Sequence, residues 1–89
     1  MGKWNYTLRF GKNLREAIKL EDVDAVIIAL IACYRELLNK LPDEDKEWKA
    51  FDIEDAIFNL ENFDEGEDVD DYLEYFYDLC DDVGAWVAI

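Results

Sequence analysis

The sequence contains neither histidine nor serine, and these absences remove the residues around which many catalytic sites are built. Histidine is the commonest general base and metal ligand, and serine is a frequent nucleophile. The chain has only four glycines, and none of them belongs to a glycine-rich phosphate loop. We therefore expect a protein that is not an enzyme and that has no cofactor and no metal site.

Long apolar segments are also missing. The longest apolar run, Ala25 to Tyr34, has ten residues, whereas a membrane-spanning helix needs about 20. The opening stretch, Met1 to Tyr6, lacks the apolar run of a secretory signal. The two cysteines, Cys33 and Cys80, fall in helix-like segments and are interpreted as reduced core residues, although a disulfide remains open if those helices face each other. These features predict a cytoplasmic protein without a membrane partner.

Basic residues are scarce and unevenly placed. The chain has nine Lys plus Arg and 23 Asp plus Glu, a formal net charge of −14, and no base follows Lys49. Residues 1–42 carry a net charge of +2, and residues 43–89 carry −16. Direct binding to nucleic acid is therefore disfavoured. Because mixed charge would serve solubility equally well, this segregation is informative.

Apolar residues, by contrast, are plentiful. They make up 52% of the 89 residues, and 15% of the residues are aromatic. A chain of this length and composition can bury one modest core and is not expected to be disordered. We predict a single domain over residues 1–89.

The two ends of the chain favour β-structure. Residues 3–10 alternate strictly between apolar and polar side chains, as in a half-buried strand. The tail, residues 85–89, is too apolar for a free end. Pairing of these segments predicts a small α+β domain of about four helices and a two-stranded sheet. The alternative is an all-α bundle with the tail packed as coil.

Two helices are predicted in the first half of the chain. Asn13 followed by Glu16 is typical of a helix start. A second start lies at Glu21–Asp22, and Pro42 ends the helix that follows. Its apolar residues keep helical spacing for five turns, which makes it the expected central helix. They are Val23, Val26, Ile27, Leu30, Ile31, Tyr34, Leu37, Leu38 and Leu41.

The middle of the chain predicts a short helix or turn and then a third helix. Residues 43–49 are polar, and Trp48 and Phe51 are expected to anchor this segment. Asp52 is expected to cap the third helix. The apolar face of that helix comprises Ile53, Ala56, Ile57, Leu60 and Phe63. Phe58 lies off this face, so we regard it as an interface candidate.

A fourth helix is predicted from about Asp68 to Val83, with Gly84 as its C-terminal cap. Its inward stripe comprises Val69, Tyr72, Leu73, Phe76, Tyr77, Cys80 and Val83. At 100° per residue, seven acids fall within about 60° of one direction on the opposite side. This acidic ridge comprises Glu67, Asp70, Asp71, Glu74, Asp78, Asp81 and Asp82. Tyr75 lies beside the ridge and is a second interface candidate.

The acidic ridge resembles a strand of DNA in its charge spacing. It extends over about 22 Å, a length in which one DNA strand carries about six to seven phosphates. The ridge also places like charges four residues apart, as at Asp70–Glu74 and Glu74–Asp78, where each pair costs about 0.2–0.5 kcal/mol. A surface that opposes the stability of its own helix is typical of a functional site.

Two stretches resemble small acidic accessory proteins of bacteriophages and prophages. They are Leu8-Arg9-Phe10-Gly11-Lys12-Asn13-Leu14-Arg15-Glu16-Ala17 and Tyr75-Phe76-Tyr77-Asp78-Leu79-Cys80-Asp81-Asp82-Val83-Gly84-Ala85-Trp86-Val87. In such proteins a Tyr-Asp-containing helix end precedes a short aromatic and aliphatic tail. The resemblance implies an accessory protein that binds a host protein, and it carries over no catalytic residue.

These observations favour a binding module that docks the acidic ridge and Tyr75 on a basic protein, and a nucleic-acid-binding surface is the expected kind of target. Occupying that surface would inhibit or regulate the partner, as a DNA mimic does. The alternative is a structural or homo-oligomeric accessory protein whose charge serves only solubility.

Overall fold

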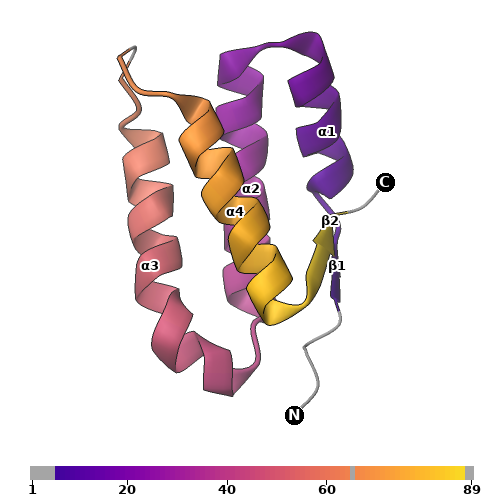
Figure 1. The fold of residues 1–89 in the computed structure, drawn as a ribbon, viewed down its shortest axis with the longest axis vertical. Helices are drawn as coiled ribbons and strands as arrows, with labels where there is room; N and C mark the ends of the chain where they lie inside the picture. The colour runs from indigo at the N-terminus through magenta and orange to yellow at the C-terminus, as the bar shows by residue number, and fades with distance from the viewer. Residues whose placement is uncertain (1–5, 65, 88–89) are drawn as a thin grey trace.

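The computed structural model describes residues 6–64 and 66–87. Within these ranges the chain forms β1 (Tyr6–Leu8), α1 (Gly11–Leu20), α2 (Val23–Lys40), α3 (Asp43–Glu61), α4 (Val69–Val83) and β2 (Ala85–Val87) (Figure 1). The molecule measures 40 × 26 × 17 Å along its principal axes. It is therefore a flat, elongated domain whose long dimension follows the helices.

Helix α2 lies at the centre of the fold. It packs against α1, α3 and α4, and α1 and α3 lie on either side of it (Figure 1). Helix α4 lies across one face of α2, whereas its backbone barely approaches that of α3. The long apolar stripe therefore correctly predicted the central helix, and Pro42 follows its end as expected.

The ends of the described chain meet as two short strands. β1 and β2 pair in parallel, with Tyr6 opposite Ala85 and Leu8 opposite Val87. The expected strand residues 3–5 and 88–89 lie outside the described residues. Three-residue strands form no layer that helices could cover, and helices of 10, 18, 19 and 15 residues dominate the described chain. The all-α bundle therefore describes the domain better than the α+β class, although the expected four helices are present.

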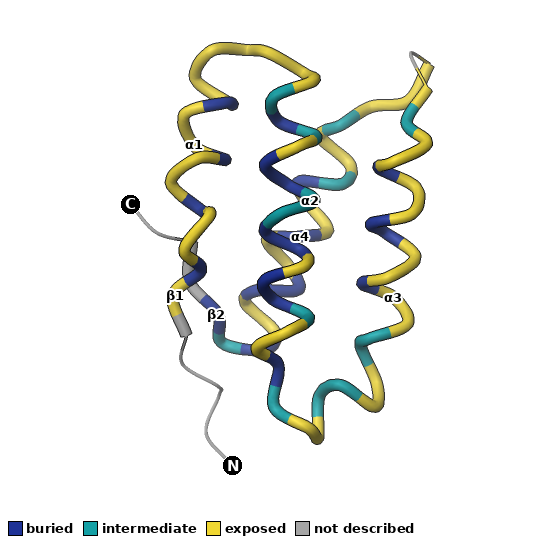
Figure 2. Tube along the Cα trace, turned by 180° about the vertical axis from the view of Figure 1, so that it is seen from behind, coloured by how far each residue is buried: buried dark blue, intermediate teal, exposed yellow. Residues whose placement is uncertain are grey.

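The core lies where α2 meets its neighbours (Figure 2). The Tyr34 and Phe76 side chains are fully buried and form an edge-to-face ring pair with centroids 5.0 Å apart. The Tyr34 hydroxyl donates a hydrogen bond to the carbonyl oxygen of Tyr72 at 3.0 Å. Because a buried hydroxyl needs such a partner, this bond fixes how α4 lies on α2.

Several helix ends fall where the sequence places them. An Asp22 side-chain oxygen accepts a hydrogen bond from the Ala25 amide at 3.3 Å, and Asp68 does the same for Asp70 at 3.0 Å. Each oxygen satisfies an amide that has no partner inside the helix. Gly84 ends α4 in the left-handed region, with φ 81°, which glycine adopts without strain.

The predicted start of α1 at Asn13 is wrong. The helix begins at Gly11, and the residue before it, Phe10, has no side chain able to cap the first turn. A residue of α2 instead holds the backbone just before the helix. The buried Glu36 carboxylate accepts hydrogen bonds from the Arg9 amide at 2.8 Å and the Phe10 amide at 3.1 Å.

The predicted break before Asp52 is also wrong. Helix α3 runs without interruption from Asp43 to Glu61, because no glycine or proline stands between these residues. Asp52 is consequently an exposed position within the helix. Trp48 and Phe51 do not anchor the segment, since they are 80% and 77% exposed. The inward face is confirmed for Ile53, Ala56, Ile57 and Leu60, which are buried, whereas Phe63 lies beyond the end of α3 and is only half-buried.

The buried stripe of α4 is rotated slightly from the predicted one. Leu79 is buried, although the predicted stripe omitted it, and Tyr77 is 42% exposed, although the stripe included it. Leu73, Phe76, Cys80 and Val83 are buried as predicted. On the helical wheel Leu79 and Tyr77 mark opposite edges of the apolar arc, so a small rotation exchanges them.

Both cysteines are free thiols in the core, as predicted. Cys33 is fully buried and Cys80 is 4% exposed. Burial raises the pKa of each thiol to about 12.

We expect neither thiol to react with a thiol-specific reagent in the native protein at about pH 8, because reaction requires the thiolate. Both should react after unfolding. Rapid labelling of one cysteine in native buffer, followed by mass spectrometry, would contradict this placement.

Candidate functional site

The acidic ridge lies on the solvent side of α4. All seven predicted acids are exposed, and Tyr75 is 40% exposed. The opposite side of the helix is buried through Leu73, Phe76 and Cys80. The helical wheel therefore placed these side chains correctly, and hydrophobic burial of one face is what turns the acids outward.

The N-terminal end of the acidic ridge differs from the prediction. Glu67 precedes α4 and lies in the turn before the cap residue Asp68. One of its carboxylate oxygens accepts a hydrogen bond from the Asp64 amide at 3.3 Å. The helical part of the ridge therefore extends from Asp70 to Asp82, about 18 Å at 1.5 Å per residue.

The C-terminal end of the acidic ridge is tied to α3. The Lys49 ammonium and an Asp82 carboxylate oxygen are 2.5 Å apart. This hydrogen bond is the main reason why the pKa of Lys49 lies above its usual value. The ion pair also reduces the unfavourable effect of an acid at a helix C-terminus. The ion pair therefore offsets part of the ridge charge at Asp82, whose side chain stays 63% exposed.

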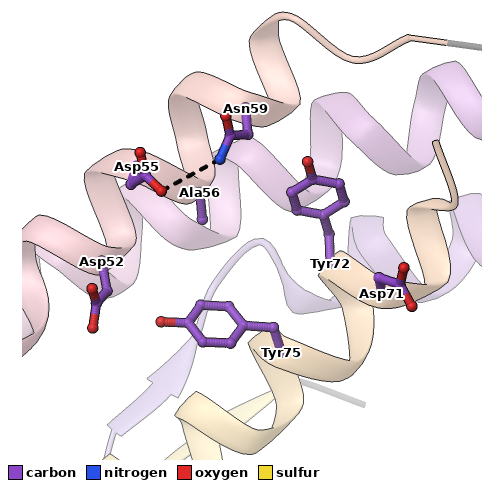
Figure 3. Close-up of a pocket in the computed structure, with 7 residues that line it drawn as sticks. All are labelled: Asp52, Asp55, Ala56, Asn59, Asp71, Tyr72 and Tyr75. Carbon is purple, nitrogen blue, oxygen red and sulfur yellow. Dashed lines mark hydrogen bonds between the residues drawn. The ribbon is translucent and has the colours of Figure 1, made fainter.

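A groove separates α3 from α4 beside the acidic ridge. We call it the α3–α4 groove; it has a volume of about 250 Å³. Its lining residues are Asp52, Asp55, Ala56, Asn59, Asp71, Tyr72 and Tyr75 (Figure 3). The aspartates of both helices thus join the ridge and the groove in one acidic surface. The sequence prediction missed Asp52 and Asp55 because it treated Asp52 as a helix cap.

Tyr75 extends from α4 across the α3–α4 groove, with its hydroxyl towards Asp52 (Figure 3). Its ring lies nearly parallel to that of the buried Tyr34, with centroids 6.5 Å apart. Burial is the main cause that raises the pKa of Tyr75, and the Asp52 carboxylate acts in the same direction. Tyr75 is therefore a neutral aromatic group that presents part of its ring between carboxylates.

The groove brings a tyrosine ring and several carboxylates together on one surface. A guanidinium group can stack on a tyrosine ring and pair with neighbouring carboxylates at the same time. Within residues 6–64 and 66–87, no three His, Cys, Asp or Glu residues are grouped so that they could hold a metal ion. None of the described helices combines the length and apolar character that crossing a membrane requires.

Comparison of the chain with protein-family models, curated proteins and solved structures finds no match.

Proposed function

We propose that the protein is an acidic binding module that docks the acidic ridge and the α3–α4 groove on a basic surface of another protein. The observation that supports this most strongly is the continuity of charge from α4 to α3. Exposed acids follow α4, and Asp52 and Asp55 face the same groove from α3. A surface of one sign speeds encounter with a partner of opposite sign and excludes like-charged ones.

The partner that fits best is a protein whose own basic surface binds nucleic acid. The helical part of the ridge places six carboxylates along about 18 Å, a length over which a DNA strand carries about five phosphates. Tyr75 adds an aromatic contact next to this row of charge. Inhibition or regulation would follow from occupying that surface, in agreement with the resemblance to phage accessory proteins.

The acidic ridge can be tested by neutralising its centre. The triple variant Asp70→Asn/Glu74→Gln/Asp78→Asn should bind the partner about tenfold more weakly or worse, because charge complementarity is lost. The same variant should be about 0.5–1.5 kcal/mol more stable than the wild type, because three like-charge pairs along α4 disappear. Denaturant unfolding followed by circular dichroism measures this gain.

Partner binding can be measured by affinity capture from a lysate, followed by identification of the captured proteins and competition with duplex DNA. The matched control is Glu16→Gln/Glu21→Gln/Asp24→Asn, which removes three exposed acids from α1 and its junction with α2. We expect the captured proteins to be nucleic-acid-binding proteins. The control variant should retain them, the ridge variant should lose them, and duplex DNA should displace them. If both variants lose partner binding to the same extent, binding depends on the overall negative charge and not on the position of the acids in the ridge. A stable homo-oligomer without such partners would favour the structural alternative.

A further inference from the structure

Helix α3 presents an unpartnered row of aromatic side chains on its outer face. Trp48, Phe51 and Phe58 are 80%, 77% and 64% exposed. At 100° per residue they fall within about 80° of one another, centred about 170° from the buried residues of the same helix. Figure 2 shows α3 at the edge of the molecule, with its buried positions only on the side towards α2. The row therefore contributes nothing to the described core.

The spacing of this row is that of a helix-packing seam. Positions 44, 48, 51, 55 and 58 alternate in steps of four and three residues, the repeat by which two helices pack side by side. Three of these five positions are large aromatic residues, and Asp55 stands between two of them. We call the segment from Trp48 to Phe58 the α3 seam; it is about 15 Å long.

Acids make up five of the six residues that flank the α3 seam. One flank consists of Glu47, Glu54 and Glu61, which are spaced seven residues apart. The other consists of Asp45, Asp52 and Asn59. Glu61 lies 3.7 Å from the Arg35 guanidinium, a pair in which both side chains are at least half exposed. Among the described flank residues there is no base, although Arg35 lies beside Glu61 and Lys49 interacts with Asp45. The flanks therefore carry net negative charge, most fully at Glu47, Glu54 and Asp52.

The flanking charge excludes several occupants. In a parallel pair with a second copy of this chain, Glu47 would face Asp52, and in an antiparallel pair the glutamate flanks would face each other. Both arrangements place like charges together, which opposes association. An anionic membrane surface is repelled for the same reason. Complementary charge is provided by a helix with apolar seam residues and basic flanks.

We propose that the α3 seam docks an amphipathic helix of a partner protein, with the partner's apolar residues on Trp48, Phe51 and Phe58 and its Lys or Arg residues against the acidic flanks. Exposed aromatic residues of this kind are the usual anchors of protein interfaces. An amphipathic helix could bind these side chains as α3 presents them, without a change in the structure of α3. This inference goes beyond the docking of the acidic ridge, because its anchors are the exposed aromatic residues of α3 and not the acids of α4. The seam adjoins the α3–α4 groove, since Asp52, Asp55 and Asn59 line that groove as well.

A synthetic peptide provides the test. The probe is a helical peptide of three heptads with Leu at the seam positions and Lys at the flanking positions. The control peptide has Glu in place of Lys. Isothermal titration and peptide anisotropy measure the affinity of each for the full chain. We expect binding of the Lys peptide with a blue shift of tryptophan emission, because Trp48 becomes buried, and no binding of the Glu peptide. The blue shift should disappear in Trp48→Phe.

Two pairs of matched variants locate the binding site. Phe51→Ser/Phe58→Ser should weaken the Lys peptide at least about tenfold, whereas Ile28→Ser, which removes a 70% exposed side chain from α2, should leave it unchanged. Glu47→Gln/Glu54→Gln should weaken it more than Asp70→Asn/Glu74→Gln, which removes the same charge from the acidic ridge. The substituted side chains are exposed, and circular dichroism checks that each variant folds.

Three results would overturn the inference. They are failure of the wild type to bind the Lys peptide, a larger loss in the ridge variant than in the Glu47/Glu54 variant, and a wild-type dimer in sedimentation that Phe51→Ser/Phe58→Ser dissociates. The second result would leave the proposed function of the acidic ridge intact, and the third would assign the seam to a second copy of the chain. Conversely, if the Lys peptide binds at the seam, the inference about the seam holds even if the acidic ridge captures no partner.

Discussion

Replacing Glu36 by alanine should cost about 2–4 kcal/mol of unfolding free energy, a large share of the roughly 4–13 kcal/mol expected for a domain of this size. Glu36 is only 8% exposed, and its two carboxylate oxygens accept hydrogen bonds from the Arg9 and Phe10 amides. Alanine would leave both amides without these acceptors at a partly buried position. It would also remove a negative charge from the N-terminal end of α1, where the helix dipole favours one.

Glu36→Gln and Glu16→Ala are the informative companions. Glutamine keeps one acceptor oxygen, so its cost should be about half that of alanine. Glu16 is exposed on α1, and its replacement should change stability by no more than about 0.5 kcal/mol. Urea unfolding measures all three, and hydrogen exchange at Arg9 and Phe10 should accelerate most in Glu36→Ala. Equal stability of Glu36→Ala and Glu16→Ala would show that the fold does not depend on these two hydrogen bonds.

Local patterns predicted the helices that have clear start and stop residues. α2 lies between Asp22 and Pro42, and α4 lies between Asp68 and Gly84. In both helices the run of regularly spaced apolar residues is long enough to identify the buried face. The acidic ridge was predictable for the same reason, since the direction of its acids follows from which side of α4 is buried.

Tertiary features escaped the sequence prediction because no single helix contains them. The α3–α4 groove depends on how far α3 lies from α4, and Asp52 had been assigned to a helix end. Trp48 and Phe51 were expected to be anchors because large aromatic residues are usually buried, but α3 turns them outward by continuing without a break. Glu36 did carry a signal, since it follows Ala29 and Cys33 at the spacing of the buried stripe.

The protein should lose stability steeply in alkaline solution, because three buried groups keep their protons only while it is folded. Burial raises the pKa of Cys33 and Cys80 to about 12 and raises the pKa of Tyr34 well above its usual value. In the unfolded chain a cysteine ionises near pH 8.5 and a tyrosine near about pH 10. Between the unfolded and folded pKa values the folded state binds more protons, so the stability present below about pH 8 is lost as the pH rises.

Each of these groups should remove about 1.4 kcal/mol of unfolding free energy per pH unit once the unfolded pKa is passed. The two thiols alone would then remove about 7 kcal/mol by about pH 11, comparable with the stability of a small domain. Urea unfolding at a series of pH values measures the slope. Cys33→Ala should reduce the slope between about pH 9 and pH 10 by about half, whatever its stability at neutral pH.

Tyr34→Phe separates the tyrosine from the thiols. It removes the hydrogen bond to the Tyr72 carbonyl and should cost about 1 kcal/mol at neutral pH. It should leave the slope between about pH 9 and pH 10 unchanged and reduce it only above about pH 10, where an unfolded tyrosine begins to ionise. A stability that stays constant from pH 8 to about pH 11 would mean that these groups ionise equally well in the folded protein. The interior formed by α2 and α4 would then be open to water, and the packing that orients the acidic ridge would not exist.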